Sequence, residues 1–381
     1  MKFLLSAIAV LMVLPAALSA ASAAPPGDRV IIAYLFPQER VIDPAEIAAE
    51  KLTHINYAFA DIKGGKVVEG FSHDAENFKV LAGLRKKHPH LRILVSVGGW
   101  TWSGAFSDMA LTPKSRLLFV ESAVDFVRRH DLDGFDVDWE YPGLPGNGNT
   151  HRPEDTANFT ALMAELRAAL DAHGMKTSRR YLLTFAAGAS AEFLAHTEMD
   201  KVQASVDFVN LMTYDFREAG GDPLAGHHAN LFQQQSDPKK LSADRAVREF
   251  LAADVPPEKL VLGVPFYGRA WGEAEAKDKG LYQRGKALTE PLDTKYPSLA
   301  GLVGKGGWVR EWDGVAQAPF LWNADKRTFV SYEDPESLRR KCRYVREMGL
   351  AGVMFWEYTV DSTGQLLGTL FTELRTQAGR K

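Results

Sequence analysis

The sequence predicts an α/β protein, a (β/α)8 TIM barrel with a small α+β domain inserted between strand 7 and helix 7. Eight short apolar runs rich in Val, Ile, Phe and Tyr recur along the 381 residues, and segments with helical periodicity separate them. Alternating strands and helices imply parallel strands with right-handed crossovers, and eight such units suggest a closed barrel. The expected strands are 30–35, 53–59, 91–97, 134–140, 181–187, 206–214, 259–266 and 351–356.

An open, doubly wound sheet is the structural alternative. Such a sheet usually carries a Gly-rich phosphate-binding loop after its first strand. The segment AYLFPQER, which covers the end of the first expected strand and the residues after it, contains no glycine. The closed barrel is therefore the favoured fold.

Start and stop signals mark three of the expected helices. One runs from Pro153 to His173 and stops at Gly174, and another opens at Asp334-Pro335 with Gly349 after its last turn. A third opens at Thr112-Pro113 and keeps one apolar face, formed by Leu117, Val120, Val124 and Val127.

The alternation of expected strands and helices stops between Trp271 and about Phe329, where glycines and short alternating stretches such as KGGWVREWD appear. A structureless loop of that length is improbable in a compact domain. We therefore expect an inserted α+β domain at 271–330, between barrel segments 28–270 and 331–378. Its own small core is expected to contain Trp308, Trp312 and Trp322.

The first 23 residues are typical of a secretory signal peptide. Met1-Lys2 is positive, 3–14 is almost wholly apolar, and small residues follow that fit a cleavage site. A membrane anchor is the alternative, but the apolar stretch is shorter than the ~20 residues that span a bilayer. We expect a secreted protein, extracellular or periplasmic after removal of this segment. Its single cysteine, Cys342, excludes an internal disulfide and is expected to be a buried thiol.

The charge balance limits the possible partners. Lys plus Arg number 45 against 48 for Asp plus Glu, and no basic stripe appears. This argues against nucleic acid and anionic membrane surfaces as partners and favours an uncharged ligand.

The segment DLDGFDVDWE, residues 131–140, places acids and apolar residues in alternation on the fourth expected strand. Because strand side chains alternate, Asp136, Asp138 and Glu140 share one face. The other face carries Phe135, Val137 and Trp139. Helices cover the outside of a barrel, so the acids should line the inside, with Glu140 at the C-terminal strand end where barrel active sites lie. Asp133 is out of phase and is expected to give structural or electrostatic support.

Three carboxylates stacked along one strand cannot all ionise cheaply in a dry interior. At least one should keep a proton near neutral pH, and Glu140 is best placed to donate it as a general acid. Metal binding is an alternative, but no His accompanies the cluster, and the EF-hand spacing fails because its sixth position is Asp136 and not Gly. A buried hydrogen-bonded network without chemistry also stays open.

Five motifs in order along the chain resemble those of family 18 glycoside hydrolases, the chitinase family. The strand-four acids match its DxxDxDxE signature, and Trp356 matches the Trp that floors the family's cleft. The remaining three are Ser96-Val97-Gly98-Gly99, Met212-x-Tyr214-Asp215 and Tyr267-Gly268-Arg269. The inserted segment falls where some members carry an extra α+β domain, and the likeness covers essentially the whole chain after the signal segment.

The resemblance implies a substrate-assisted retaining mechanism, for which family 18 is known. Glu140 would protonate the glycosidic oxygen while the substrate's own 2-acetamido oxygen attacks the anomeric carbon. Asp138 would orient the acetamido N–H, Tyr214 would donate to its carbonyl, and Asp136 would exchange a proton with Asp138.

Further residues are expected to bind the sugar. Exposed Trp is unusual unless it binds something, and Trp100, Trp102 and Trp271 lie on expected loops. The expected substrate-binding residues are Tyr34, Phe59, Gly99, Trp100, Tyr141, Met212, Asp215, Arg269 and Trp356.

These expectations combine into a secreted, endo-type chitinase that acts as a monomer without a cofactor or metal. Its substrate would be chitin or chito-oligosaccharide, and the inserted domain would form one wall of the groove. An endo-β-N-acetylglucosaminidase acting on glycans and a chitin-binding lectin are the alternatives. The presence of the acid Glu140 argues against the lectin.

Overall fold

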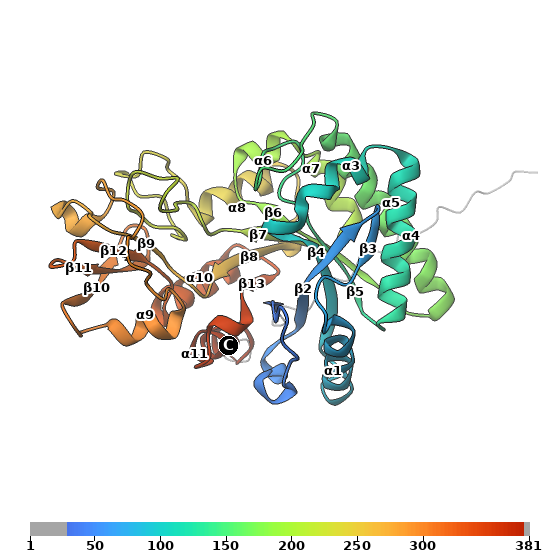
Figure 1. Ribbon diagram of the computed structural model, residues 1–381, viewed down its shortest axis with the longest axis horizontal. Coiled ribbons are helices and arrows are strands. Elements are labelled where there is room, and N and C mark those ends of the chain that lie inside the picture. The colour runs from blue at the N-terminus through green and yellow to red at the C-terminus, as the bar shows by residue number, and fades with distance from the viewer. Residues whose placement is uncertain (1–28, 377–381) are drawn as a thin grey trace, which may run out of the picture.

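A computed structural model describes residues 29–376, so the signal peptide expected at 1–23 lies outside the described residues. Eight parallel strands close into a barrel, because each pairs with the next and the last pairs with the first (Figure 1). They are β1 (Val30–Leu35), β2 (His54–Lys63), β4 (Arg92–Gly98), β5 (Gly134–Asp138), β6 (Leu182–Gly188), β7 (Phe208–Met212), β8 (Leu260–Pro265) and β13 (Gly352–Trp356). The predicted TIM barrel is confirmed.

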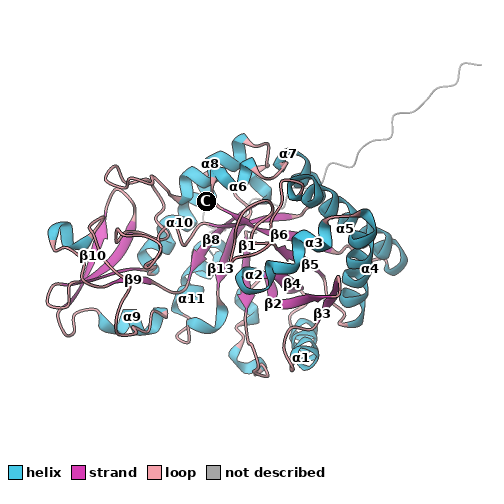
Figure 2. Cartoon of the chain, turned by 45° about the horizontal axis from the view of Figure 1, so that its top comes forward, coloured by secondary structure: helices cyan, strands magenta, loops and turns pink. Residues whose placement is uncertain are grey.

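Helices surround the strands (Figure 2). The longer ones are α1 (Asp74–Lys87), α4 (Pro113–Arg129), α5 (Asp155–Thr177), α8 (Ala243–Ala252), α10 (Pro335–Glu347) and α11 (Gln365–Phe371). Short helices lie in the loops: α2 (Gly99–Trp102), α3 (Phe106–Ala110), α6 (Ala191–Ala195) and α7 (Met199–Val202). The crossover from β1 to β2 holds two 3-10 turns, Pro44–Glu46 and Ala49–Lys51, and β2 continues into a hairpin with β3 (Lys66–Val68).

Two details of the expected helices are wrong. Leu117 is 55% exposed, because the buried face of α4 is centred on Phe119, Ala123 and Phe126 instead. Helix α5 does not stop at Gly174 but runs on to Thr177. A Cβ on Gly174 would lie 2.4 Å from the Arg179 carbonyl oxygen, so this glycine allows a close backbone approach within the helix.

The two faces of β5 follow the predicted alternation. Its outward side chains Phe135 and Val137, continued by Trp139, are buried in the hydrophobic core between the strands and the helices. The Trp139 ring stacks on Phe106 of α3 at a centroid distance of 5.2 Å. The acids between these residues therefore face the barrel interior.

The insertion between β8 and α10 is an antiparallel sheet with one helix, and it forms a lobe at the left of Figure 1. Its strands are β9 (Arg269–Trp271), β10 (Trp308–Asp313), β11 (Ala318–Asn323) and β12 (Thr328–Ser331), in the order β10-β11-β12-β9, and its helix is α9 (Tyr296–Leu302). The expected insertion is thus present, with its sheet beginning at 269 and ending at 331.

The tryptophans of the insertion differ in part from expectation. Trp271 is fully buried and not exposed, because β9 packs it against Phe329 and Ala225. Trp322 joins this small core, whereas Trp308 belongs to the main core. Trp312 is only half-buried and lies under the Arg310 guanidinium.

Cys342 is buried in α10, as expected, and burial raises the pKa of its thiol to about 12.

Among residues 29–376, no helix is both long enough and apolar enough to cross a bilayer.

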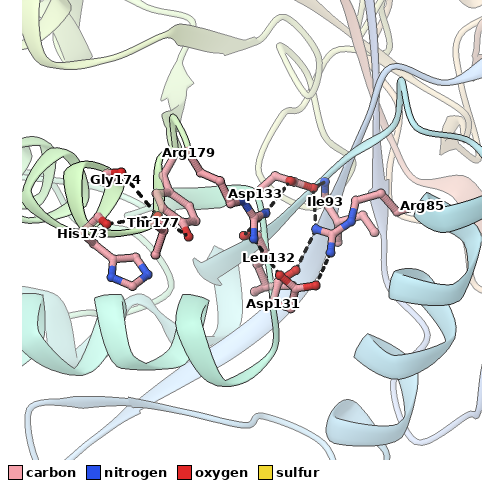
Figure 3. A network of polar contacts seen from close by, with 10 residues as sticks. Arg85, Ile93, Asp131, Leu132, Asp133, His173, Gly174, Thr177 and Arg179 are labelled. Carbon is pink, nitrogen blue, oxygen red and sulfur yellow. Dashed lines mark hydrogen bonds and ion pairs between the residues drawn. The ribbon is translucent and has the colours of Figure 1, made fainter.

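Two arginines anchor the chain just before β5 (Figure 3). The Asp133 carboxylate accepts from Arg85 Nη1, Arg179 Nη2 and the Ile93 amide, each at 2.9 Å. The neighbouring Asp131 also pairs with both arginines, but its side chain is 59% exposed. Asp133 therefore ties the start of β5 to α1, to β4 and to the segment before β6, at the end of the barrel opposite the acids.

We expect Asp133→Ala to lower the free energy of unfolding by about 3 kcal/mol, because it removes the buried carboxylate that pairs with both guanidinium groups and leaves the Ile93 amide without its acceptor. The control Asp131→Asn removes the charge of an exposed partner of the same arginines. Asn tolerates the φ of +50° at this position, so this change should cost less than about 1 kcal/mol. Urea denaturation of both variants measures the difference. Equal losses would contradict the anchoring role of Asp133.

Candidate active site

A cleft with a volume of about 1080 Å³ opens at the C-terminal ends of the barrel strands. This is the end at which TIM-barrel enzymes hold their active sites. Acidic, aromatic and small side chains line it, and among the described residues Arg269 is its one cationic lining residue. The acids are Asp138, Glu140, Glu192, Asp215 and Glu218.

Asp136 lies beneath the cleft and is fully buried. Four donors from four other strands converge on its carboxylate: Tyr34 Oη at 2.9 Å, Ser96 Oγ at 2.7 Å, Asn210 Nδ2 at 3.3 Å, and Thr184 Oγ1. Burial raises the pKa of Asp136, and these hydrogen bonds oppose the rise.

Asp138 has the opposite surroundings. It is buried, and its Oδ1 has no hydrogen-bond partner in the described protein. Burial, and then the charges of Glu140 and Asp136, raise the pKa of Asp138 well above its usual range. Asp138 therefore holds a proton in the resting site, between two other carboxyl groups.

Glu140 follows the end of β5, and its backbone is fixed on both sides. Its amide donates to Ser103 Oγ at 2.9 Å, and its carbonyl accepts from Asn149 Nδ2 at 3.1 Å. Burial raises the pKa of Glu140 to about 7, a hydrogen bond with Tyr141 opposes this, and the charge of Asp215 adds to it. Near neutral pH this carboxyl can both donate and accept a proton.

Gly98 lets β4 approach β5 closely at this point. Its φ is +108°, and a Cβ would lie 2.2 Å from the carbonyl oxygen of Asp138. Gly98 of the Ser96–Gly99 motif is therefore required, because any side chain there would prevent β4 and β5 from packing closely beside the acids.

Two polar residues of the Met212–Asp215 motif face the acids. Burial, and then the charges of Asp138 and Asp215, raise the pKa of Tyr214, so its hydroxyl remains a donor. The Asp215 carboxylate accepts from Arg269 Nε and Nη2 at 2.8 Å each and from the Tyr267 hydroxyl at 2.8 Å. Burial disfavours its charge, but His228 and Arg269 outweigh that and hold the pKa of Asp215 well below its usual range.

Aromatic rings form the floor and one wall of the cleft. Trp356 at the end of β13 stacks on Phe59 at 5.5 Å between centroids and touches Phe36 at 5.6 Å. Phe36 contacts Phe71, which in turn contacts Trp102 at 4.9 Å. Such a surface suits the apolar face of a pyranose ring.

The structure brings most of the predicted site residues together. Those that line the cleft are Tyr34, Phe59, Trp100, Asp138, Glu140, Tyr141, Met212, Tyr214, Asp215, Arg269 and Trp356. Trp100 is 51% exposed at the rim. Gly99 does not line the cleft, because it lies directly behind the Phe59 ring, where a Cβ would come within 2.6 Å. Asp136 lies beneath the cleft and does not line it.

Other lining residues were missed. Phe36 follows the end of the first strand, a position that could have been read as facing the site, whereas Phe71 lies in a loop without a sequence signal. Tyr267 was noted only as part of a motif. His228, which does not line the cleft but contacts Asp215, was not noted at all. The insertion does not form a wall of this cleft, since none of residues 271–330 lines it; Arg269 of β9 is its contribution.

The described part of the chain offers no set of side chains that could bind a metal ion. No group of three or more His, Cys, Asp or Glu side chains within residues 29–376 is arranged to hold an ion. What the site offers is a proton-bearing carboxyl at the cleft, a protonated neighbour beneath it, and a tyrosine hydroxyl as donor. This set can protonate a leaving oxygen and orient a polar substrate group.

Comparison with known proteins identifies the relatives of this arrangement. The sequence model of glycosyl hydrolases family 18 matches residues 30–361. Chitinase A1 of Niallia circulans is 37% identical over 393 residues, which cover 87% of this chain and 56% of that protein. The chain thus spans little more than half the length of that relative.

Two further relatives match over most of their own length. Chitotriosidase-1 of Mus musculus is 32% identical over 328 residues, covering 84% of this chain and 69% of that protein. A solved structure from Paenibacillus barengoltzii, described as a glycoside hydrolase family 18 N-acetylglucosaminidase, is 42% identical with a TM-score of 0.83. It covers 91% of this chain and 100% of its own.

We expect Glu140 to titrate near pH 7, and Tyr141→Phe to raise that pKa by roughly one unit, because the phenol hydrogen bond favours the carboxylate. Carboxyl ¹³C NMR of glutamate-labelled protein measures both, with the resonance assigned by its loss in Glu140→Gln. The control Tyr344→Phe removes a hydroxyl that donates to Asp244 and should leave the titration unchanged. An unshifted Tyr141→Phe titration would contradict the expected hydrogen bond.

Proposed function

Because the chain belongs to family 18 of the glycosyl hydrolases and is therefore a glycoside hydrolase, we propose that it is a chitinase. It hydrolyses β-1,4 bonds between N-acetylglucosamine units in chitin or chito-oligosaccharides. The observation that carries the proposal is the carboxyl of Glu140, which faces an aromatic-lined cleft and has a pKa of about 7. The names of the curated relatives, chitinase A1 and chitotriosidase-1, favour the same substrate.

The surroundings of the other acids favour the substrate's own amide as the nucleophile. The Asp215 carboxylate accepts from Arg269 and Tyr267, and its pKa is held well below its usual range, which makes it a poor nucleophile. Asp138 lies on the same strand as Glu140 and is kept protonated by burial. An ordinary retaining glycosidase needs a free carboxylate facing its acid across the bond.

The mechanism follows from these positions. Glu140 gives its proton to the glycosidic oxygen as the C1–O bond breaks, and the acetamido carbonyl oxygen of the same sugar bonds to C1. Asp138 accepts from the acetamido N–H and stabilises the oxazolinium ion, while Tyr214 donates to the acetamido oxygen. Asp136 shares the proton released from Asp138. Glu140 then takes a proton from a water molecule that attacks C1, and the bond from C1 to the acetamido oxygen breaks, so the β configuration is retained.

We propose endo-type cleavage by a monomer. The cleft volume of about 1080 Å³ is at the upper limit of sites for single drug-sized ligands, which favours several sugar units bound in a row. The residues that the mechanism requires, Glu140, Asp138, Asp136 and Tyr214, lie together in a single barrel, which favours a monomer.

A second candidate is N-acetylglucosaminidase action, because the solved structure that is 42% identical carries that description. Product analysis on chitohexaose and on an N-glycosylated protein separates the two. Internal cleavage of chitohexaose supports the chitinase, whereas release from the glycoprotein or of single terminal sugars supports the second candidate.

We also propose that the chain is exported, with residues 1–23 removed. The support is the positive start, apolar stretch and small-residue cleavage pattern of this segment. N-terminal sequencing of protein recovered outside the cytoplasm should give a first residue near 24. Intact Met1 in the exported fraction would contradict cleavage.

We expect Glu140→Gln to reduce turnover of chitotetraose by about 10³-fold or more, while oligosaccharide affinity stays largely intact, because the amide cannot donate the proton. Reducing-end release and calorimetric titration measure the two effects. The control Glu121→Gln, on the exposed surface of α4, should behave as wild type. A loss of affinity as large as the loss of turnover would indicate a binding role.

The product anomer tests the nucleophile independently. Proton NMR during cleavage of a chito-oligomer should show the β-anomer first. An initial α-anomer would rule out participation of the acetamido group.

A further inference from the structure

Two adjacent histidines lie in the loop between β7 and α8, and both are buried. They face opposite ways. His227 Nε2 lies 3.2 Å from Asp313 of the inserted sheet, whereas His228 Nδ1 lies 3.3 Å from Asp215 Oδ1 beside the cleft. Neither residue lines the cleft itself. The mechanism proposed above uses neither.

The position of His228 is fixed on all sides. Its amide donates to Ser331 Oγ of β12 at 2.9 Å, and its carbonyl accepts from the Phe216 amide at 3.1 Å. Its ring packs against Tyr267 at a centroid distance of 5.5 Å. The imidazole lies with Nδ1 toward Asp215.

The charges around the ring decide its protonation. Burial, Arg269 and Lys341 of α10 disfavour the imidazolium, Asp215 favours it, and the pKa of His228 is lowered on balance. The Lys341 ammonium is itself engaged by Glu333 and by the Ala229 carbonyl. The ring is therefore neutral at neutral pH.

The tautomer of the His228 ring follows from its hydrogen-bond partner, Asp215. The ionised Asp215 carboxylate can only accept, so the ring must carry its hydrogen on Nδ1. Nε2 is then a bare acceptor, and no donor within the described residues reaches it. The ring can therefore serve Asp215 only as a neutral N–H donor.

Asp215 is the link between this ring and Glu140. Its Oδ1 receives Arg269 Nε and His228 Nδ1, and its Oδ2 receives Arg269 Nη2 and Tyr267. Its negative charge also favours the protonated form of Glu140. A second cation on Asp215, added to Arg269, would cancel that charge; a neutral N–H donor holds the carboxylate without doing so.

We propose that His228 is a positioning residue for the hydrolytic reaction: its neutral Nδ1–H holds the Asp215 carboxylate facing the general acid Glu140 and adds no positive charge between them. This role rests on the proposed function, because it concerns the proton that Glu140 delivers.

The test is the pH profile of kcat/KM on chitotetraose for a set of variants. His228→Leu removes the donor and should lower kcat/KM about tenfold. It should also move the alkaline limb to lower pH by roughly half a unit, because a loosened Asp215 repels the Glu140 carboxylate less. His228→Asn restores an N–H donor and should recover most of both effects. His227→Leu is the matched control: it loses a buried, carboxylate-paired ring that faces the insertion and should leave the alkaline limb in place.

A double-mutant cycle separates positioning from simple structural support. If His228 acts through Asp215, His228→Leu has no further effect on the profile in the Asp215→Asn background. An undiminished tenfold loss in that background, or an alkaline limb that His228→Leu leaves unmoved, would overturn the proposal.

NMR supplies a readout that needs no turnover. In ¹⁵N-histidine-labelled protein, the His228 ring, assigned by its loss in His228→Asn, should show Nδ1–H with bare Nε2 at pH 7 to 8. Asp215→Asn should shift the Nδ1 signal. An imidazolium or an Nε2–H tautomer at pH 7 in the wild type would overturn the inference without any measurement of turnover. A wild-type protein that releases no reducing ends refutes the proposed function, whereas an active wild type with additive losses in the cycle refutes the role of His228 alone.

Discussion

One buried carboxylate, Asp136, organises the catalytic end of the barrel, because donors from four other strands converge on it. They are Tyr34 of β1, Ser96 of β4, Thr184 of β6 and Asn210 of β7. A polar group in this interior is tolerated only while its partners are all in place. The strand pairing that closes the barrel therefore also supplies the donors of Asp136. Displacement of any of the four donor strands would break its backbone pairing and remove a hydrogen bond from the Asp136 carboxylate.

The order of proton affinities along β5 follows from this arrangement. Asp136 is stabilised by its donors, Asp138 has an Oδ1 without a partner, and Glu140 reaches the cleft. Desolvation raises the pKa of each. Hydrogen bonds from four strands oppose the rise at Asp136, and a hydrogen bond with Tyr141 opposes it at Glu140. The carboxyl groups above Asp136, those of Asp138 and Glu140, are therefore the ones that hold a proton, and a substrate can reach it there. Asp133 fixes the other end of the same strand and contributes to stability only.

Eight apolar runs separated by helical segments were enough to predict the barrel and its strands, and period-two alternation on the fourth strand was enough to predict the inward acids, because both patterns can be read from local sequence. The errors concern tertiary packing. Trp271 resembled an exposed loop residue, since nothing local shows that β9 packs it against a distant loop. Gly174 resembled a helix stop, although its role is to admit the Arg179 carbonyl. Phe71 and His228 reach the site through loops whose paths the sequence does not encode by any periodic pattern.

The hydrogen bond from the His228 amide to Ser331 joins the loop beside the cleft to the last strand of the inserted sheet. The lobe lends the cleft only one side chain, Arg269, yet it fastens the loop that carries Asp215. Regions of a protein open locally with different free energies. A local opening of the lobe would release the loop that carries His228 and its contact to Asp215, while the barrel that carries Glu140 stays folded.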